Sequence, residues 1–401
     1  MRHITIVAAN YRPETGAAAQ RIVSIAEELV RRGWGVTIVT QLPHYPQNHI
    51  YPAYDLPSPH FSDEAGVMVI RLRPWIVPRE SLLLRTLSEL FFCLQALPHL
   101  LRAPTSILMA SSPYMFLGPL GLFVSRIRRK TFVWDVRDLT WLYPRATGKR
   151  TFGLDKPVEQ FMLWVAHRTD ALTTATEGLM NYFSRRPTPS IVLANGVSDP
   201  WLERLIALRP TADADDPVVL YAGLFGYNHG LSTVVEAARL LPDITFVLAG
   251  DGPERRSLEE RVHQDGLTNV EFMGYLNEKQ LIEAYQESTV LVSHVRRNEL
   301  YRWTQPAKLW EYMATGRPVI HAGEGEIIDI LKAHSIAITV PPEQPEAMAS
   351  AVHQLLANPE TSIAMGQRGR DFVIRHRKRS VLLEQFVGVL DRLTTTKGQT
   401  K

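Results

Sequence analysis

The chain has 401 residues, of which 45% are hydrophobic and 21% charged, and this balance excludes disorder as its main state. Lys and Arg total 44 against 41 Asp and Glu, a formal net charge of +3, which is too even for a dedicated nucleic-acid binder. The single cysteine, Cys93, excludes an internal disulfide framework and a multi-cysteine metal site.

We expect neither a secretory leader nor a membrane-spanning helix. The apolar run after His3 is too brief for a cleavable signal. No stretch reaches the roughly 18 apolar residues that a spanning helix needs. The segment Leu82–Leu101 comes nearest, but Arg85, Glu89 and His99 interrupt it.

In the first half, short apolar runs alternate with segments of helical spacing. We expect strands at residues 4–9, 36–40, 107–110, 131–136, 171–175 and 191–194, with helices at 17–32 and 119–127. Strands that alternate with helices favour a parallel sheet covered on both faces.

The second half repeats this pattern after a Pro-, Ala- and Asp-rich linker at residues 208–217. We expect strands at 218–222, 244–249, 270–273, 290–293, 319–320 and 336–340, a helix at 231–241, and final helices over 345–392. The predicted fold class is therefore α/β with two doubly wound, Rossmann-like domains facing a cleft. The domains span 1–207 and 208–375, and a C-terminal helix at 376–401 returns to the first.

Ligands of parallel sheets bind at the carboxyl ends of the strands, so the loops there are candidate sites. The loop Asn10–Gly16 opens a helix, and Gly16 permits close backbone approach to an anion. It lacks the spacing of a dinucleotide fingerprint, and an ordinary turn remains an alternative. The loop Gly250–Glu254 has only part of that fingerprint, because Arg255 replaces the third glycine, and a structural turn is favoured there.

The stretch Gln305–Ile320 combines helix signals with charge. Pro306 suits the first helical position and Gly316 the helix end. Lys308 lies in the first turn, where free N–H groups and the dipole favour a phosphate, and Glu311 shares its face. The alternative is a Lys–Glu pair on a solvated face.

The segment Trp134–Leu139 ends a strand in the first half. Its polar side chains are expected to point into the cleft, which makes Asp138 a candidate. The alternative is an ion pair between an aspartate and the neighbouring Arg137.

Five segments, in this order, resemble motifs of the family 4 retaining glycosyltransferases with the GT-B fold. Tyr11–Gly16 looks like the Y-x-P-x-x-G loop, Arg31–Thr40 like the following helix end and strand, and Asn195–Val197 like the N-G-V segment. Ala249–Glu254 is similar to the G-x-G-P turn, and Lys308–Ile320 to the E-x-x-A-x-G-x-P-V-I block. The resemblance covers nearly the whole chain.

Bacterial enzymes of O-antigen, capsule or exopolysaccharide assembly are the most similar branch, on Ala110–Pro113, Val136–Leu139 and Pro306–Ala314. The resemblance implies that Glu311 binds the donor ribose or sugar hydroxyls and that Lys308 holds the diphosphate. It also places Gly223 near the phosphates, Gly16 across the cleft, and Tyr275 and Leu276 beside the nucleobase.

The sequence departs from the family pattern at three places. Trp303 stands where many members carry the first Glu of an E-x7-E pair, and no histidine is evident after Trp134, so Asp138 takes the place of the catalytic histidine. The loop after Gly223 lacks the usual Arg and Lys and has His229 where the Lys often falls. Lys308, Arg296 or Arg297 would supply the charge instead.

The resemblance implies metal-independent transfer of a sugar, with retention, from a nucleotide diphosphate sugar to a saccharide acceptor that is lipid-linked. We expect no cofactor and no metal, and a UDP-sugar as the donor. Asp213–Asp215 has the form of a D-x-D motif but lies in the linker. Two alternatives remain open: a nucleotide-sugar 2-epimerase of the same fold, and a catalytically silent relative that binds a nucleotide sugar or a partner.

Leu- and Phe-rich residues 81–101 and nearby basic residues suggest shallow attachment to anionic lipid. The basic residues are Arg79, Arg85, Arg102, Arg126, Arg128, Arg129, Lys130, Arg375, Arg377, Lys378 and Arg379. We therefore expect a cytoplasmic protein, peripheral on the inner face of the plasma membrane. The alternative is a core helix with solvated charges.

Overall fold

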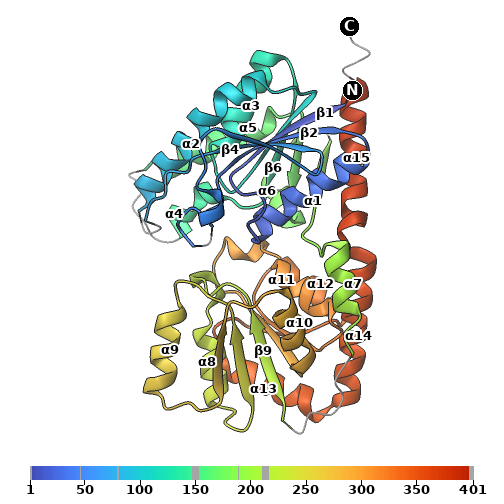
Figure 1. Ribbon diagram of the computed structural model, residues 1–401. Coiled ribbons are helices and arrows are strands. Elements are labelled where there is room, and N and C mark those ends of the chain that lie inside the picture. The colour runs from blue at the N-terminus through green and yellow to red at the C-terminus, as the bar shows by residue number, and fades with distance from the viewer. Residues whose placement is uncertain are drawn as a thin grey trace. The chain divides into compact units, whose positions relative to one another are not determined.

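The computed structural model describes residues 2–45, 47–78, 81–146, 153–187, 189–209 and 216–396 (Figure 1). Arg79 and the Asp213–Asp215 motif lie outside these residues. None of the described helices is long and apolar enough to cross a membrane.

The chain forms two units. One comprises Met1–Ala194 with Leu382–Lys401, and the other Asn195–Val381. This division precedes the predicted boundary at residue 207, because helix α7 (Asp199–Ile206) buries Leu202 and Leu205 in the core of the second unit. Helix α15 (Arg379–Thr396) begins in the second unit, and its later residues are part of the core of the first.

The first unit contains an eight-stranded sheet in the order β3-β4-β2-β1-β5-β6-β7-β8. Its strands are β1 (His3–Ala8), β2 (Gly35–Gln41), β3 (His60–Glu64), β4 (Val67–Leu72), β5 (Ile107–Ser111), β6 (Thr131–Val136), β7 (Ala171–Thr174) and β8 (Ser190–Val192). Sequence reasoning missed the hairpin β3–β4, the one antiparallel pair in the sheet among the described residues. Ala65 and Gly66 both have positive φ, as a two-residue hairpin turn requires.

Helices cover both faces of this sheet (Figure 1). They are α1 (Ala17–Arg31), α2 (Leu82–Arg102), α3 (Leu117–Arg128), α4 (Tyr143–Ala146), α5 (Asp155–His167) and α6 (Glu177–Tyr182). Val133 of β6 belongs to the core that α1 and α15 build, whereas Phe132 and Trp134 point to the other face. There α3 approaches so closely that a Cβ on Gly121 would lie 2.2 Å from Phe132.

The second unit contains a six-stranded sheet in the order β11-β10-β9-β12-β13-β14, and every pair is parallel. Its strands are β9 (Val218–Ala222), β10 (Thr245–Ala249), β11 (Val270–Gly274), β12 (Val290–His294), β13 (Val319–Ala322) and β14 (Ile338–Val340). Its helices are α7, α8 (Ser232–Arg239), α9 (Arg255–Gln264), α10 (Glu278–Glu287), α11 (Ala307–Ala314), α12 (Glu326–His334), α13 (Pro345–Ala357) and α14 (Pro359–His376).

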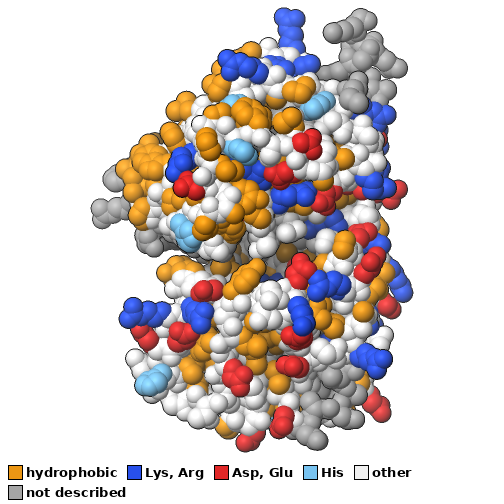
Figure 2. All heavy atoms as spheres, viewed as in Figure 1, with side chains coloured by type: hydrophobic (Ala, Val, Ile, Leu, Met, Phe, Trp, Pro, Cys, Tyr) orange, Lys and Arg blue, Asp and Glu red, His pale blue; other side chains and the backbone are white. Residues whose placement is uncertain are grey.

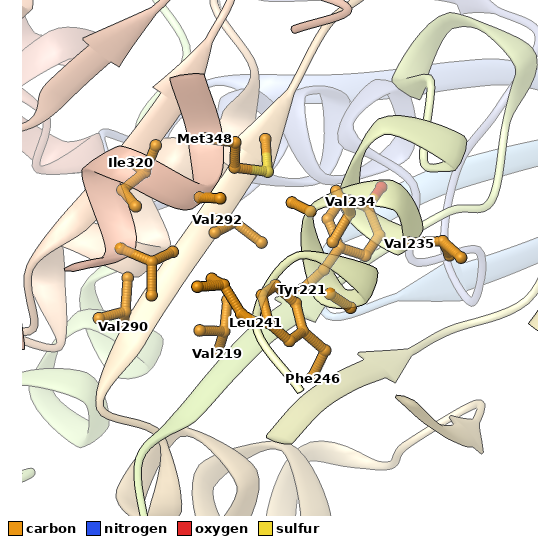
Figure 3. Packing of buried hydrophobic residues seen from close by; sticks show 14 of the residues in the cluster. Val219, Tyr221, Val234, Val235, Leu241, Phe246, Val290, Val292, Ile320 and Met348 are labelled. Carbon is orange, nitrogen blue, oxygen red and sulfur yellow. The ribbon is translucent and has the colours of Figure 1, made fainter. Parts of the chain in front are cut away.

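Alternate residues of β9 pack into two separate hydrophobic cores in this unit. Val219 and Tyr221 pack with Val234 of α8 and Met348 of α13 (Figure 3). Leu220 and Ala222 instead pack into the core on the other face. Because helices cover both faces of a parallel sheet in each unit, the predicted doubly wound α/β class is confirmed.

Candidate functional site

The candidate donor site lies at the carboxyl end of β9 in the second unit. β9 has β10 on one side and β12 on the other. The chain adds β10 and β11 on the first side and then β12, β13 and β14 on the second, so the direction of the strand order reverses beside β9. Open α/β sheets bind ligands at such a switch point. The loops after β9, β10 and β12 therefore frame the site.

The loops after β9 and β10 are joined by backbone hydrogen bonds. Phe225 N–H donates to Asp251 O at 2.9 Å, and Glu254 N–H donates to Phe225 O at 3.0 Å. Gly250 has a φ of +141°, and a Cβ there would lie 1.8 Å from Gly223 O. The glycines of this loop therefore serve close backbone packing, as the structural-turn interpretation expects.

Tyr312 fixes helix α11 against the end of β9. Its buried hydroxyl accepts a hydrogen bond from Ala222 N–H at 2.8 Å and donates one to Ala222 O at 2.7 Å. Lys308 lies one turn earlier, so this bond brings its ammonium beside Gly223. Gly223 has a φ of +158°, and a Cβ there would lie 1.9 Å from Lys308 Nζ, so a larger residue would displace the ammonium from this position.

A buried tyrosine holds the Lys308 ammonium. Lys308 Nζ donates to Tyr221 Oη at 2.6 Å and lies 4.2 Å from the centre of the Tyr221 ring. Tyr221 in turn donates to Leu224 O at 2.8 Å. Burial lowers the pKa of Lys308 to about 7, although the charge of Glu311 opposes this shift. An anion bound here would stabilise the ammonium form.

Glu311 does not form an ion pair with Lys308 within the described part of the chain. Its carboxylate is hydrogen-bonded to the Trp201 side chain, from helix α7. Burial raises the pKa of Glu311, and the Trp201 bond and the charge of Lys308 only partly oppose it. Both side chains are half-buried, so the alternative of a Lys–Glu pair on a solvated face is wrong.

His229 and Arg296 lie at the same end of the sheet. Arg296 N–H donates to Asn228 O at 2.9 Å, and its guanidinium pairs with Glu254 at 2.9 Å. Burial lowers the pKa of His229 to about 3, and the charge of Lys308 adds to the shift. His229 is therefore neutral near pH 7 and can contribute hydrogen bonds but no charge. Arg297 pairs with Glu324 at 3.0 Å.

Tyr275 and Leu276 follow the next strand, β11. Gly274 O, just before them, accepts a hydrogen bond from Gly250 N–H at 2.7 Å, so their loop adjoins the β10 loop. The Tyr275 side chain is 71% exposed, whereas Leu276 packs against the core cluster that includes Leu309. The nucleobase contact assigned to them stays a prediction.

In the first unit, the side chains at the end of β6 are more deeply buried than the sequence suggested. Trp134 and Asp135 are buried, so the expectation that the polar side chains of this segment point into the cleft is wrong for Asp135. Arg21 of α1 forms two hydrogen bonds with the Asp135 carboxylate, at 2.7 and 3.1 Å. The hydroxyl groups of Ser111 and Thr173 also donate hydrogen bonds to the Asp135 carboxylate. The ion pair thus forms with a distant arginine rather than with Arg137.

Asp138 follows β6 and remains the candidate of this unit. Burial raises its pKa, and the adjacent charge of Arg137 opposes the shift. The Arg137 guanidinium donates to Ser112 O, and the Arg137 backbone N–H donates to Ser112 Oγ at 2.9 Å. A carboxyl group with a raised pKa suits proton transfer.

Gly16 is the N-cap of α1 and has an extended backbone with φ −62°. A Cβ added at Gly16 would lie 3.3 Å from Tyr45 Cε1. The close approach of an anion to this backbone stays a prediction. Buried Glu14 organises this loop, because it accepts the N–H groups of His44 and Tyr45 at 2.9 and 2.8 Å. Gly16 thus begins the helix in a loop that Glu14 holds.

Two family models match the chain in succession. The glycosyl transferase 4-like domain matches residues 16–196, and glycosyl transferases group 1 matches residues 208–372. The putative colanic acid biosynthesis glycosyl transferase WcaI of Escherichia coli K12 is 23% identical over 96% of this chain and 98% of its own. The O-antigen chain mannosyltransferase C of Escherichia coli is 29% identical, over 39% of this chain and 41% of its own.

Solved structures share the fold over almost the full length. Sucrose-phosphate synthase from Thermosynechococcus elongatus has a TM-score of 0.78 at 19% identity, and covers 99% of this chain and 100% of its own. Anabaena HepE in complex with UDP-glucose has a TM-score of 0.70 at 14% identity, over 98% and 100%. The chain is a glycosyltransferase with the GT-B fold. These matches do not favour the epimerase alternative.

Three residues of this glycosyltransferase were missed by sequence reasoning: Tyr221, Tyr312 and Trp201. The tyrosines lie in apolar stretches and are typical of core positions, and Trp201 is far from Glu311 along the chain. Among the described residues, no group of three or more His, Cys, Asp or Glu side chains is arranged to hold a metal ion.

Proposed function

We propose that this glycosyltransferase moves a sugar from a nucleotide diphosphate sugar to a hydroxyl of a saccharide acceptor, as a family 4 enzyme of cell-surface polysaccharide assembly. The similarity to WcaI, a putative colanic acid biosynthesis glycosyl transferase, and to an O-antigen chain mannosyltransferase supports this class of pathway. The observation that carries the donor assignment is the Lys308 ammonium, which lies beside Gly223 with no carboxylate paired to it in the described residues.

In the proposed reaction, the bond between the anomeric carbon and the diphosphate oxygen breaks, and its electron pair stays on that oxygen. Lys308 and the first turn of α11 stabilise the charge that develops there. The acceptor oxygen bonds to the anomeric carbon on the same face, and its proton passes to the departing diphosphate. Glu311 accepts hydrogen bonds from donor hydroxyls, so it orients the sugar nucleotide.

We assign Gly223, His229 and Arg296 to the same donor site, with Tyr275 and Leu276 at its base-binding side, and Asp138 to the acceptor side. The donor is a UDP-sugar, a choice supported by the HepE structures in complex with UDP and with UDP-glucose. The reaction needs no metal. The acceptor is lipid-linked, and the enzyme works as a peripheral protein on the inner face of the plasma membrane.

A thermal-shift screen with UDP-, GDP- and dTDP-sugars tests the donor assignment. The true donor class should raise the melting temperature most, because stabilisation grows with ligand concentration over Kd. The Lys308→Ala variant should lose this shift. Equal shifts in both proteins would remove the basis of the site.

Product analysis tests the reaction itself. Anomeric NMR should show retention, and addition of a chelator should leave the rate unchanged. An inverted product would contradict same-face attack, and a chelator-sensitive rate would contradict metal independence.

A further inference from the structure

The outward surface of one helix layer in the first unit is apolar. Helices α2, α3 and α5 cover one face of the sheet, and their solvent-facing side chains would ordinarily be polar. Instead this surface, here called the outer apolar face, exposes Leu83, Leu87, Leu90, Phe91, Leu94, Phe123, Ile127, Phe161 and Trp164. Figure 2 shows hydrophobic side chains gathered over the part of the unit where α2 lies.

Helix α2 is apolar on both sides. Leu83, Leu87, Leu90 and Leu94 recur at helical spacing and lie on one side, with Leu94 70% exposed and Leu83 68% exposed. The opposite side carries the buried residues Ser88, Phe92, Ala96 and Leu100. Burial in the unit therefore accounts for only one of the two apolar sides.

The three helices form one continuous surface. α3 packs against α2 on one side and against α5 on the other. The Arg128 guanidinium donates to Leu100 O at 2.9 Å and to Ala103 O at 2.7 Å, which ties the end of α3 to the end of α2. Arg126 donates to Arg168 O just beyond α5. Continuous exposed apolar surfaces mark interaction sites in soluble proteins.

Aromatic rings extend this surface at both edges. Trp75 makes an edge-to-face contact with Phe91, with ring centres 6.1 Å apart. Phe161 and Trp164 stack at 5.8 Å on α5, and Arg168 lies 4.2 Å from the Trp164 ring. Rings with an adjacent cation are typical of the boundary between lipid tails and headgroups.

The charges around the outer apolar face are mostly positive. Helices α2 and α3 with the two residues that follow α3 carry six basic residues, Arg85, Arg102, Arg126, Arg128, Arg129 and Lys130. Their one acidic residue, Glu89, accepts the Met115 N–H at 3.0 Å, and burial raises its pKa to about 7. Helix α5 with Arg168 adds two basic residues and two acidic ones, and the Tyr182 hydroxyl donates to the carboxylate of one of these, Glu159, at 2.6 Å. The surface therefore presents an excess of cations beside apolar side chains.

We propose that the outer apolar face inserts its Leu, Phe and Trp side chains into the interfacial layer of an anionic bilayer, while the basic residues contact the lipid phosphates. An anionic surface complements both features. A second copy of the chain does not, because pairing this face with itself would bring two sets of like charges together. The inference deepens the membrane location in the proposed function and rests on it, but it is independent of the donor chemistry.

Sedimentation with vesicles tests the insertion of apolar side chains. The wild-type protein should bind vesicles that contain anionic phosphatidylglycerol and bind neutral phosphatidylcholine vesicles weakly. Leu94→Glu and Phe123→Glu should each lower the partition coefficient roughly tenfold, since an exposed apolar contact with lipid is lost. The control Leu240→Glu changes a 41% exposed leucine of the second unit and should bind like wild type.

A second set of variants tests the charges. The triple variant Arg85→Gln, Arg102→Gln and Lys130→Gln should weaken binding to anionic vesicles. The matched triple Arg256→Gln, Lys279→Gln and Lys332→Gln removes the same charge from exposed positions of the second unit and should not. Equal losses in the two triples would overturn the charge argument.

Two further outcomes would overturn the proposal. One is wild-type binding no stronger than that of Leu94→Glu. The other is light scattering that shows a dimer which Leu94→Glu converts to a monomer, because a second copy would then cover the face. The thermal shift with UDP is measured on every variant and should not change. Loss of the UDP shift in wild type with vesicle binding intact would defeat the donor assignment alone.

Discussion

Asp135 in the first unit and Lys308 in the second are charged side chains near the carboxyl end of their sheets, and they have different partners. The Asp135 carboxylate of the first unit accepts hydrogen bonds from Arg21, Ser111 and Thr173. Burial by itself would raise the pKa of Asp135, but these partners outweigh burial and hold the pKa below its usual range. Among the described residues, Lys308 of the second unit has the neutral Tyr221 hydroxyl as its hydrogen-bond partner and no carboxylate paired with it. Burial lowers the pKa of Lys308 to about 7, although the charge of Glu311 opposes the shift. A charge whose partners are complete stabilises the fold, whereas a charge that lacks a counter-ion is available to a ligand.

The largest effect should come from breaking the complete pair. Arg21→Met leaves the Asp135 carboxylate buried without its counter-ion, and the free energy of unfolding should fall by about 3–5 kcal/mol. Urea unfolding measures this change. The double variant Arg21→Met with Asp135→Asn should recover part of the loss. A loss below about 1 kcal/mol in the single variant would mean that Asp135 is satisfied without Arg21.

Lys308→Met should have little effect on stability and a large effect on activity, in contrast to Arg21→Met. It removes a buried charge without a counter-ion, so unfolding in urea should change little or become harder. Sugar transfer should fall about a hundredfold, because a group that stabilises charge on the leaving diphosphate is lost. Rates are measured with the donor identified in the thermal screen. Unchanged turnover, or a stability loss as large as that of Arg21→Met, would erase the contrast between the two charges.

The pH dependence of donor binding sharpens the same contrast. Diphosphate binding favours the ammonium form of Lys308, so affinity should be greatest below the free-state pKa of about 7 and fall as pH rises above it, by at most about tenfold per unit. Calorimetric titration with UDP between pH 7.5 and 9 measures the slope. Lys308→Arg keeps its charge over this range and should give a flatter slope. Equal slopes in both proteins would show that another group titrates.

The outlines of both sheets could be predicted because buried parallel strands are continuous apolar runs. The hairpin strand His60–Glu64 could not, since its polar residues lack such a run. Lys308 and Glu311 were identified by helix signals and spacing. Their surroundings were not, because Tyr221 and Tyr312 act through hydroxyl groups whose partners depend on tertiary packing.

Tyr221→Phe tests how Lys308 is held. The ring that packs in the core is kept, and only the hydroxyl that accepts from Lys308 and donates to Leu224 O is removed. We expect a stability loss of about 1 kcal/mol and a several-fold rise in Kd for UDP. The Tyr285→Phe variant, at another buried tyrosine of the unit, serves as the control. If the two variants bind UDP equally well, Tyr221 only fills space.

The smallest effect is expected at the pair between Arg296 and Glu254, which joins the loops after β12 and β10. The arginine side chain is 38% exposed, so solvent screens the pair and the coupling free energy should not exceed about 1 kcal/mol. A double-mutant cycle with Arg296→Gln and Glu254→Gln measures it in the free protein and with UDP bound. If Arg296 leaves Glu254 to contact the diphosphate, the coupling will shrink in the bound state and the single Arg296→Gln variant will bind UDP less tightly. A coupling that persists with UDP, together with unchanged affinity, would make Lys308 the main cation of the site and Arg296 a loop-joining residue.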